Sequence, residues 1–171
     1  MLSEGQTAGS GVGRTGLMLN GYQAVTLVLC ALTFLVEGFD MQTLALAVPT
    51  LAPEWGQPPA RFGIAIAALN IGAVLSTAFI APLGDVIGRR KIISAALLVM
   101  GTGVTATAAS TEVWHLVALR FASGLAYGVA VVNLHALITE QFPQNHRALF
   151  LTIATTNLSV GSIVGGMANE W

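Results

Sequence analysis

The chain alternates long apolar runs with short polar ones. Charged and turn-forming residues separate five nearly uncharged stretches of its 171 residues, at 24–51, 62–83, 92–111, 113–139 and 148–169. Each stretch is close to the roughly 20 residues that an α-helix needs to cross a bilayer. The connections between them are short and polar, so neighbouring helices are expected to run antiparallel. The pattern predicts an all-α, polytopic membrane helix bundle.

Composition supports a membrane protein and excludes other classes. Hydrophobic residues make up 54% of the chain and charged residues 9%, a balance that one soluble core cannot bury. The seven basic and eight acidic side chains nearly cancel, so no nucleic-acid partner is expected. Cys30 is the one cysteine, which rules out an intramolecular disulfide and a multi-cysteine metal site. We expect a packed thiol at this position and lipid around the bundle.

The basic residues predict how the bundle is oriented. On a path of five alternating helices, Arg61 falls on one side, and the other side receives Arg14, Arg89, Arg90, Lys91 and Arg147. Cytoplasmic loops carry the excess of basic residues in membrane proteins, so the N-terminus is predicted to be cytoplasmic. The same path gathers three tryptophans at the outer boundary, where indole rings favour the headgroup region: Trp55, Trp114 and Trp171.

Residues 1–21 are rich in glycine and serine and lack an apolar core. A flexible cytoplasmic tail is expected there, instead of a cleaved signal peptide. The segment GSGVGRTG superficially resembles a phosphate-binding loop, but it lacks the Gly-Lys-Ser/Thr ending and follows no predicted strand. Nucleotide binding is therefore not expected.

Two acids, Glu37 and Asp40, interrupt the first apolar stretch, with uncharged residues 24–36 before them and 41–51 after them. Neither flank alone could span the bilayer, so both acids are expected near the midplane. Their spacing of three residues places them on one helix face. A charged acid at that depth costs on the order of 3 kcal/mol and usually faces the bundle interior or a water-filled cavity. We interpret these acids as groups that bind and release protons. The alternative is that they are neutral, hydrogen-bonded and only lock helix packing.

Arg120 is the candidate partner of these acids. It lies about 9 Å inside the boundary marked by Trp114, in an otherwise uncharged stretch, and it cannot lose its charge. Tyr127 and His135 fall within roughly 60° of Arg120 around the helix, which predicts a polar stripe. Two alternatives stay open: Arg120 extends to the outer headgroups, and His135 is a packed, neutral histidine.

Small residues at helical spacing predict close helix packing. Lipid gives no hydrophobic drive between helices, so close backbone approach supplies the contact energy. Candidate positions occur in three stretches: Gly124 and Gly128, Gly161 and Gly165, and Gly63, Ala67, Gly72 and Ser76. We interpret them as packing positions of a tight bundle without a direct role in function.

The segment APLGDVIGRRK, the 81–91 loop, resembles the signature loop between the second and third helices of the major facilitator superfamily. Six positions match the family pattern, namely Leu83, Gly84, Asp85, Gly88, Arg89 and Arg90. Ala81 and Val86 depart from it. Glycine permits a tight turn and an aspartate can cap a helix N-terminus. The resemblance implies a gating loop that latches the outward-facing state, with Asp85 meeting the second half of the transporter and Arg90 pairing with Glu140.

The segment EGFDMQTLALAVPTLAPEWG resembles the first helix of the aromatic acid:proton symporters of that superfamily. Glu37 replaces the family's first aspartate, and the matching positions are Gly38, Phe39, Asp40, Pro49, Leu51 and Trp55. The segment RFASGLAYG resembles the opening of the family's fourth helix, and it is followed by Glu140, Pro143 and Arg147 of the closing loop. The resemblance covers residues 20–170.

The resemblance implies a secondary transporter in a bacterial cytoplasmic membrane, in which two six-helix halves rock around a midplane site. A proton gradient would drive a small organic anion inward, with no other cofactor. Glu37 and Asp40 would couple protons and line the site, Arg120 would supply a counter-charge, and the possible cavity-lining residues are Phe39, Tyr127 and His135. Phe39 is alternatively a packing residue, and sugar or drug transport by the same fold stays open.

The chain is too short for the whole architecture that the resemblance implies. Residues 22–171 would form the first five helices of the N-terminal half, whereas twelve such helices need roughly 410 residues. A missing C-terminal half is therefore an expected partner, and a truncated, non-transporting membrane protein is the alternative. An enzyme is not expected: an intramembrane aspartyl protease needs two aspartates at one depth, but Asp85 lies at the boundary and Asp40 at the midplane. The sequence presents no metal site or cofactor motif.

Overall fold

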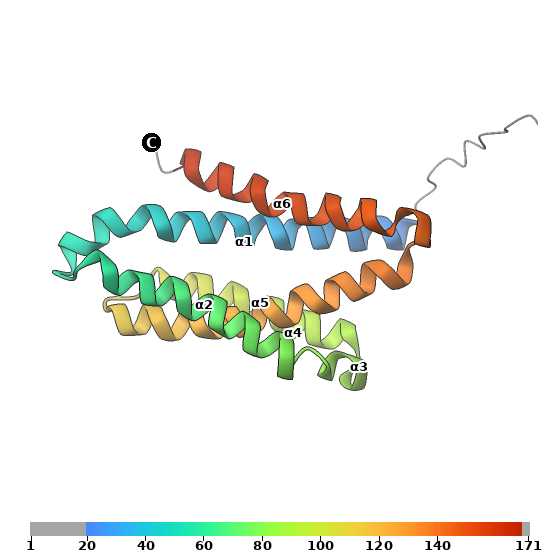
Figure 1. Cartoon of the computed structure of the whole chain (residues 1–171), viewed down its shortest axis with the longest axis horizontal. Coiled ribbons are helices and arrows are strands. Elements are labelled where there is room, and N and C mark those ends of the chain that lie inside the picture. The colour runs from blue at the N-terminus through green and yellow to red at the C-terminus, as the bar shows by residue number, and fades with distance from the viewer. Residues whose placement is uncertain (1–19, 169–171) are drawn as a thin grey trace, which may run out of the picture.

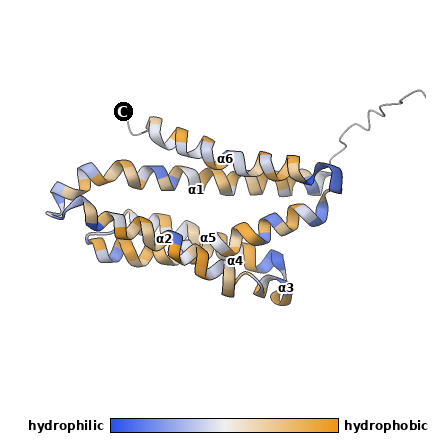
Figure 2. Ribbon diagram, in the orientation of Figure 1, coloured by the Kyte–Doolittle hydropathy of each residue, from blue (hydrophilic) through white to orange (hydrophobic). Residues whose placement is uncertain are grey.

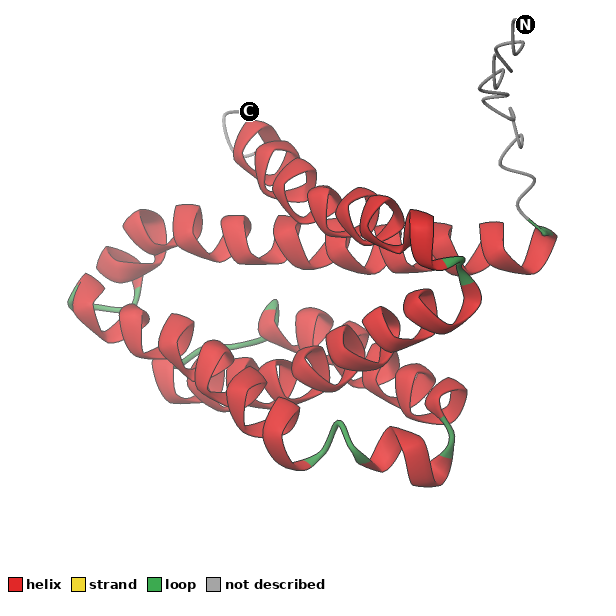
Figure 3. Ribbon diagram, turned by 45° about the vertical axis from the view of Figure 1, so that its right-hand side comes forward, coloured by secondary structure: helices red, strands yellow, loops and turns green. Residues whose placement is uncertain are grey.

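The computed structural model describes residues 20–168, which fold into helices joined by short connections without a strand in that range (Figure 1; Figure 3). The helices are α1 (Gly21–Glu54), α2 (Pro59–Phe79), α3 (Leu83–Ile87), α4 (Arg89–Thr107), α5 (Val113–Gln141), the 3-10 helix η1 (Gln144–His146) and α6 (Arg147–Ala168). The predicted all-α fold is confirmed for this part of the chain. Predictions made for Arg14, Trp171 and most of the N-terminal tail lie outside the described residues.

Four helical segments of the described chain are long and apolar enough to cross a membrane: α1, α2, α5 and the segment Gln144–Ala168. With 34 residues α1 is roughly 51 Å long, well beyond the hydrocarbon thickness of about 30 Å, so it can cross with a tilt. Its N-cap Asn20 and Gln23 form a reciprocal capping box.

Two helices end earlier than their apolar runs suggest. The stretch predicted at 62–83 stops as a helix at Phe79, because Pro82 follows and the amides of Ile80 and Ala81 both turn back to the Ser76 carbonyl. The helix predicted at 92–111 begins earlier, at Arg89, and ends at Thr107, after which the chain makes tight turns. Hydropathy alone did not show these turns, because the residues that form them are themselves apolar or small.

The helices are arranged in two layers. In both ribbon views α6 lies along α1, whereas α2, α4 and α5 form a second group (Figure 1; Figure 3). One apolar cluster joins the layers around Cys30 and Phe34 of α1, and a second joins Leu44 and Ala52 of α1 to Phe62, Ala65, Val113 and Leu116. Cys30 is fully buried, as expected of a packed thiol. The stretch of α1 between the two clusters contains Glu37 and Asp40, and Figure 2 shows a hydrophilic segment in the middle of this helix.

The seam between α2 and α5 depends on glycine. A Cβ on Gly72 would lie 2.5 Å from the Phe121 carbonyl oxygen, and one on Gly124 or Gly128 would collide with carbonyl oxygens of α2. The predicted packing role of these glycines is confirmed, because only a missing side chain permits this approach. The prediction is wrong for Gly63, whose added Cβ would meet nothing within 4 Å, since this position lies on the exposed face of α2.

A second glycine seam joins α1 to α6. A Cβ on Gly161 would collide with the Leu35 carbonyl oxygen, and one on Gly165 would lie 3.0 Å from the Phe39 carbonyl oxygen. Gly38 makes the matching contact from α1, against the backbone of Leu158. The predicted packing role of Gly161 and Gly165 is therefore confirmed.

Candidate functional site

Arg120 of α5 and Asp40 of α1 form a buried, two-pronged ion pair between the layers. The Arg120 Nη2 donates to Asp40 Oδ1 at 3.1 Å, and Nη1 donates to Oδ2 over a shorter distance. Arg120 is 4% exposed and Asp40 9%. A planar guanidinium fits both carboxylate oxygens at once, which fixes the geometry of both side chains. Arg120 therefore points to the first helix and does not extend to a headgroup region.

Glu37 lies beside this pair without a counter-charge of its own. It is 4% exposed, and its Oε1 has no hydrogen-bond partner among the described residues. Asp40 and Arg120 are both within electrostatic reach of Glu37. The guanidinium thus pairs with Asp40 and not with Glu37 among the described residues, and its Nε also has no partner in residues 20–168. Buried polar atoms without partners are rare and mark places where a proton, water or ligand can bind.

The α1–α6 seam orients the acids. Ser162 Oγ of α6 donates to the carbonyl oxygen of Gly38 at 3.1 Å, and Gly38 separates the two acids in the sequence. Because α6 contacts α1 through Gly38, Glu37 and Asp40 are buried on the side that meets α5. The site is therefore positioned by two contacts on opposite faces of one helix.

The three possible cavity-lining residues lie in different surroundings. Tyr127 is half-buried on α5 within electrostatic reach of Glu37, as the predicted polar stripe suggests. His135 lies about 22 Å further along α5 from Arg120 and stacks on the Phe34 ring, with centroids 5.6 Å apart. Phe39 presents its backbone to α6, and its side chain is 38% exposed. Their roles in binding stay predictions.

A cavity of about 270 Å³ opens beside Arg120. Its lining consists of Met41, Leu44, Ile66, Leu69, Asn70 and Arg120. Sequence reasoning missed Asn70 of α2. The signal that could have found it is a single amide inside the otherwise apolar run 62–75. The cavity is lined by residues of α1, α2 and α5, and Arg120 is the member of the ion pair that lines it.

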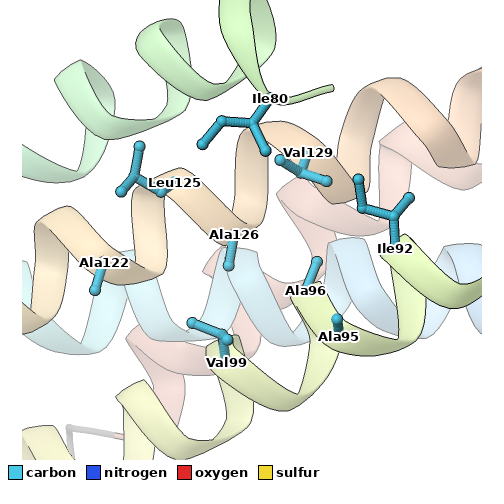
Figure 4. A pocket seen from close by; sticks show the side chains of 9 residues that line it. All are labelled: Ile80, Ile92, Ala95, Ala96, Val99, Ala122, Leu125, Ala126 and Val129. Carbon is cyan, nitrogen blue, oxygen red and sulfur yellow. The ribbon is translucent and has the colours of Figure 1, made fainter. Parts of the chain in front are cut away.

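The cavity in Figure 4, of about 310 Å³, lies between α4 and α5 below Ile80 and is lined entirely by apolar side chains. It has no group that could orient a ligand, so it is better suited to a lipid tail or a neighbouring apolar segment than to a polar substrate.

The 81–91 loop forms a charged cluster with the end of α5. Arg89 donates to Asp85 at 2.9 Å and pairs with Glu140 at 3.0 Å. The expectation that Arg90 pairs with Glu140 is wrong, because Arg89 is the partner of Glu140. Arg90, the next residue of α4, points about 100° away around the helix and lines a different groove, with Tyr22 and Ile93. Asp85 lies in the first turn of α3 and makes no capping hydrogen bond, so its expected capping role is also not observed.

Glycine and asparagine shape this loop. Gly88 has φ of 101°, a conformation that other residues rarely adopt, and it joins α3 to α4. Asn133 of α5 is 3% exposed and donates to the Ala81 carbonyl at 3.3 Å and to the Val129 carbonyl at 2.9 Å. It also packs against Gly84, where a Cβ would collide with its side chain. Sequence reasoning missed Asn133, although Leu83, Gly84 and Asp85 beside it were predicted to form the loop.

The two ends of the bundle differ in chemistry. Trp55 packs on Phe62 in the same apolar cluster as Val113, the neighbour of Trp114, so both described tryptophans belong to one end. Arg89, Glu140 and Arg147 lie at the opposite end, where Arg147 Nε donates to the Phe142 carbonyl at 3.0 Å. Figure 2 shows hydrophilic residues gathered at the helix ends. This is the separation of tryptophans and basic residues that the sequence predicted.

Apolar helices around an internal charged site define a polytopic membrane protein with a polar centre. The chain matches the family model of the Major Facilitator Superfamily over residues 30–171, and it belongs to this superfamily. The family resemblance seen in the 81–91 loop is thereby confirmed.

The curated relatives include several transporters of aromatic acids. The chain is 33% identical to a gallate transporter of Pseudomonas putida over 150 residues, 88% of this chain and 33% of that protein. It is 30% identical to the 4-hydroxybenzoate transporter PcaK of Acinetobacter baylyi over 153 residues, 90% of this chain and 34% of the relative. The PcaK protein of Pseudomonas aeruginosa is 32% identical over 151 residues, 88% of this chain and 34% of the relative. The chain spans about a third of the length of these relatives.

Proposed function

We propose that this chain is the first part of a proton-coupled secondary transporter that imports a small aromatic carboxylate by alternating access. The observation that carries the proposal is the buried Arg120–Asp40 ion pair with the unpartnered Glu37 beside it. An ionisable group at membrane depth is expensive, and in transporters such groups serve substrate and proton binding. The names of the relatives support an aromatic acid as substrate.

The charges of the site suggest how a proton and an anion bind together. A proton on Glu37 removes the negative charge that has no partner. A proton on Asp40 releases the two Nη groups of Arg120, which can then hold a substrate carboxylate in the same two-pronged geometry. The incoming carboxylate replaces the charge that the proton on Asp40 removes, and the proton on Glu37 makes the net charge of the buried site one unit less negative. Binding of substrate and proton would therefore favour each other.

Arg120 also favours an anion over the alternative substrates. A neutral sugar gives a freed guanidinium no counter-charge, and a buried unpaired charge costs several kcal/mol. The other parts of the proposal are a bacterial cytoplasmic membrane, a cytoplasmic N-terminus and a C-terminal half that completes the substrate path. In this setting Asp85, Arg89 and Glu140 would latch one conformation of the transporter.

The first experiment is the mass of the native polypeptide, measured by immunoblot of its own membrane. A band near the size of roughly 410 residues supports a complete two-half transporter. A band near the 17.7 kDa of the chain supports the truncated, non-transporting alternative and contradicts transport by alternating access.

The second experiment measures uptake of labelled 4-hydroxybenzoate into vesicles that contain the complete transporter. Uptake should rise when the outside is made more acidic than the inside, and a protonophore should abolish accumulation. Glu37→Gln should lose gradient-driven accumulation but retain exchange of substrate across the membrane, since exchange needs no net proton movement. Glu54→Gln is the matched control, because Glu54 is an exposed acid at the end of the same helix. Accumulation by Glu37→Gln with normal dependence on the gradient contradicts the proton role.

A further inference from the structure

The cavity beside Arg120 has apolar walls and two polar groups. Met41 and Leu44 of α1 and Ile66 and Leu69 of α2 form the walls, and the polar groups belong to Asn70 and Arg120. Its volume of about 270 Å³ lies just below the range of roughly 300–1,000 Å³ that is usual for small-molecule sites. Apolar walls of this extent suit a single ring with its substituents.

The two polar groups offer opposite hydrogen-bonding functions. Arg120 is 4% exposed, and its Nε is a donor without a partner in the described part of the chain. Asn70 is exposed, and its Nδ2 donates to the Ile66 carbonyl of its own helix at 3.1 Å. This bond fixes the amide so that Oδ1 is the free end, and Oδ1 accepts no hydrogen bond from any residue between 20 and 168. A carbonyl oxygen can only accept, so its ligand must supply a donor.

The position of Asn70 argues against a purely structural role. It is the one amide in the apolar run 62–75 of a membrane-spanning helix. A polar side chain at such a position avoids lipid and faces other helices or a water-filled cavity. The one hydrogen bond that its side chain makes within residues 20–168 lies in its own helix turn, so among these residues it ties no second helix to α2.

We propose that Asn70 is a specificity residue that selects aromatic carboxylates carrying a ring hydroxyl. The carboxylate binds toward Arg120, the ring lies against the apolar walls, and the hydroxyl donates to Asn70 Oδ1. This inference rests on the proposed function and adds the part of the substrate that the ion pair cannot distinguish. Benzoate and its hydroxylated relatives carry the same carboxylate, so Arg120 binds both alike.

Hydrogen bonding gives the expected size of the preference. A substrate without the hydroxyl displaces water from Asn70 Oδ1 but donates no hydrogen bond in its place. The loss of one such hydrogen bond changes affinity about tenfold. Asn70 is partly solvated, so a larger factor is not expected. The apolar walls contribute equally to both substrates, because they contact the shared ring.

The experiment compares 4-hydroxybenzoate and benzoate in the complete transporter. The measured quantity is the ratio of their kcat/KM values for uptake, which cancels differences in the amount of protein in the membrane. Wild type should prefer the hydroxylated acid about tenfold. Asn70→Leu, of similar size but without an acceptor, should bring the ratio close to one, and Asn70→Gln should restore part of the preference.

Asn157→Leu is the matched control. Asn157 of α6 makes the same bond within its own helix, from Nδ2 to the Ile153 carbonyl at 2.7 Å, and it does not line this cavity. Its ratio should equal that of wild type. If Asn70→Leu does not reach the membrane, Asn70→Ala is judged by the same ratio.

The outcomes separate the two proposals. An unchanged preference in Asn70→Leu or Asn70→Ala overturns the role of Asn70 and leaves the proposed transport of aromatic acids intact. The same holds if Asn157→Leu loses as much preference as Asn70→Leu. A wild-type transporter that takes up neither acid overturns the proposed function and this inference with it.

Discussion

Ser162 on α6 donates a hydrogen bond of 3.1 Å to the carbonyl oxygen of Gly38 on α1. The contact lies between the two buried acids in the sequence and on the opposite side of α1 from Arg120. The backbones of α1 and α6 approach closely at Gly38. A rotation of α1 about its axis would break this contact between the two helices. The orientation of the acids therefore depends on a packing contact that involves neither of them.

Replacing Gly38 by alanine should destabilise the protein by about 1–3 kcal/mol, because the added Cβ collides with the Leu158 backbone. Uptake should fall as well, because α6 would move away from α1 and the two acids would no longer be held in their orientation. Thermal unfolding in detergent and uptake in vesicles measure the two effects. Gly63→Ala is the control: its Cβ would meet nothing within 4 Å, and alanine is the better helix former, so stability should be kept or raised. Equal melting temperatures of Gly38→Ala and wild type contradict the seam.

The sequence predicted the glycine seams only in part. Spacing of four identified Gly124 with Gly128 and Gly161 with Gly165, because each pair lies on one helix face. It could not distinguish Gly72, which packs, from Gly63, which does not. Which side of a helix faces a neighbour depends on the neighbour, and a mostly apolar helix such as α2 has no continuous polar face to mark it.

The candidate site was predictable where charge is costly. Glu37, Asp40 and Arg120 stand out because ionised groups rarely occur in apolar runs. Asn70 and Asn133 did not, since a neutral amide is much less costly to bury and common in membrane helices. The wrong choice of Arg90 over Arg89 has a geometric reason: successive residues point about 100° apart around a helix, and a motif match does not fix the rotation.

Removing one partner of the Arg120–Asp40 pair should be more harmful than removing both charges. Arg120→Gln leaves Asp40 buried without a counter-charge, and a loss of about 3–5 kcal/mol is expected. The Arg120→Gln, Asp40→Asn double variant leaves neutral groups that can hydrogen-bond, so its loss should be clearly smaller than the sum of the single losses. Denaturation of the purified proteins checks this. Additive losses contradict a direct pair.

Double neutralisation should not restore transport. Neutral partners can keep the fold stable, but the proposed substrate site requires the charge of the guanidinium, which the double variant lacks. We therefore expect the double variant to be well folded and inactive in uptake. Arg61→Gln is the control, because Arg61 is an exposed arginine that pairs only with Gln57 among the described side chains.

Arg89→Gln should slow turnover more than Arg90→Gln. Arg89 bridges Asp85 and Glu140, whose side chains are 68% and 56% exposed, so the bridge contributes little to folding stability, on the order of 1 kcal/mol or less. Its effect is expected in kcat with KM nearly unchanged, since the cluster lies far from the ion pair. Uptake kinetics of the two variants at equal membrane levels make the comparison. A larger loss of turnover in Arg90→Gln than in Arg89→Gln contradicts the gating role of the Arg89 bridge and favours Arg90 as the partner of Glu140.

Asn133 should connect the 81–91 loop to α5. Asn133→Ala removes its bonds to the Ala81 and Val129 carbonyls and leaves space beside Gly84, so a loss of about 1–3 kcal/mol is expected. Asn157→Ala, which loses a bond only within its own helix, should cost less than 1 kcal/mol.

A double-mutant cycle distinguishes contact with the loop from a local effect on α5. Gly84→Ala places a Cβ where the Asn133 side chain lies, so it should be destabilising in wild type. In the Asn133→Ala background the same Cβ enters the vacated space, and its cost should largely disappear. If Gly84→Ala costs the same in both backgrounds, Asn133 does not hold the loop. If the cost disappears and turnover stays low, the hydrogen bond to Ala81, and not the packing, positions the loop for gating.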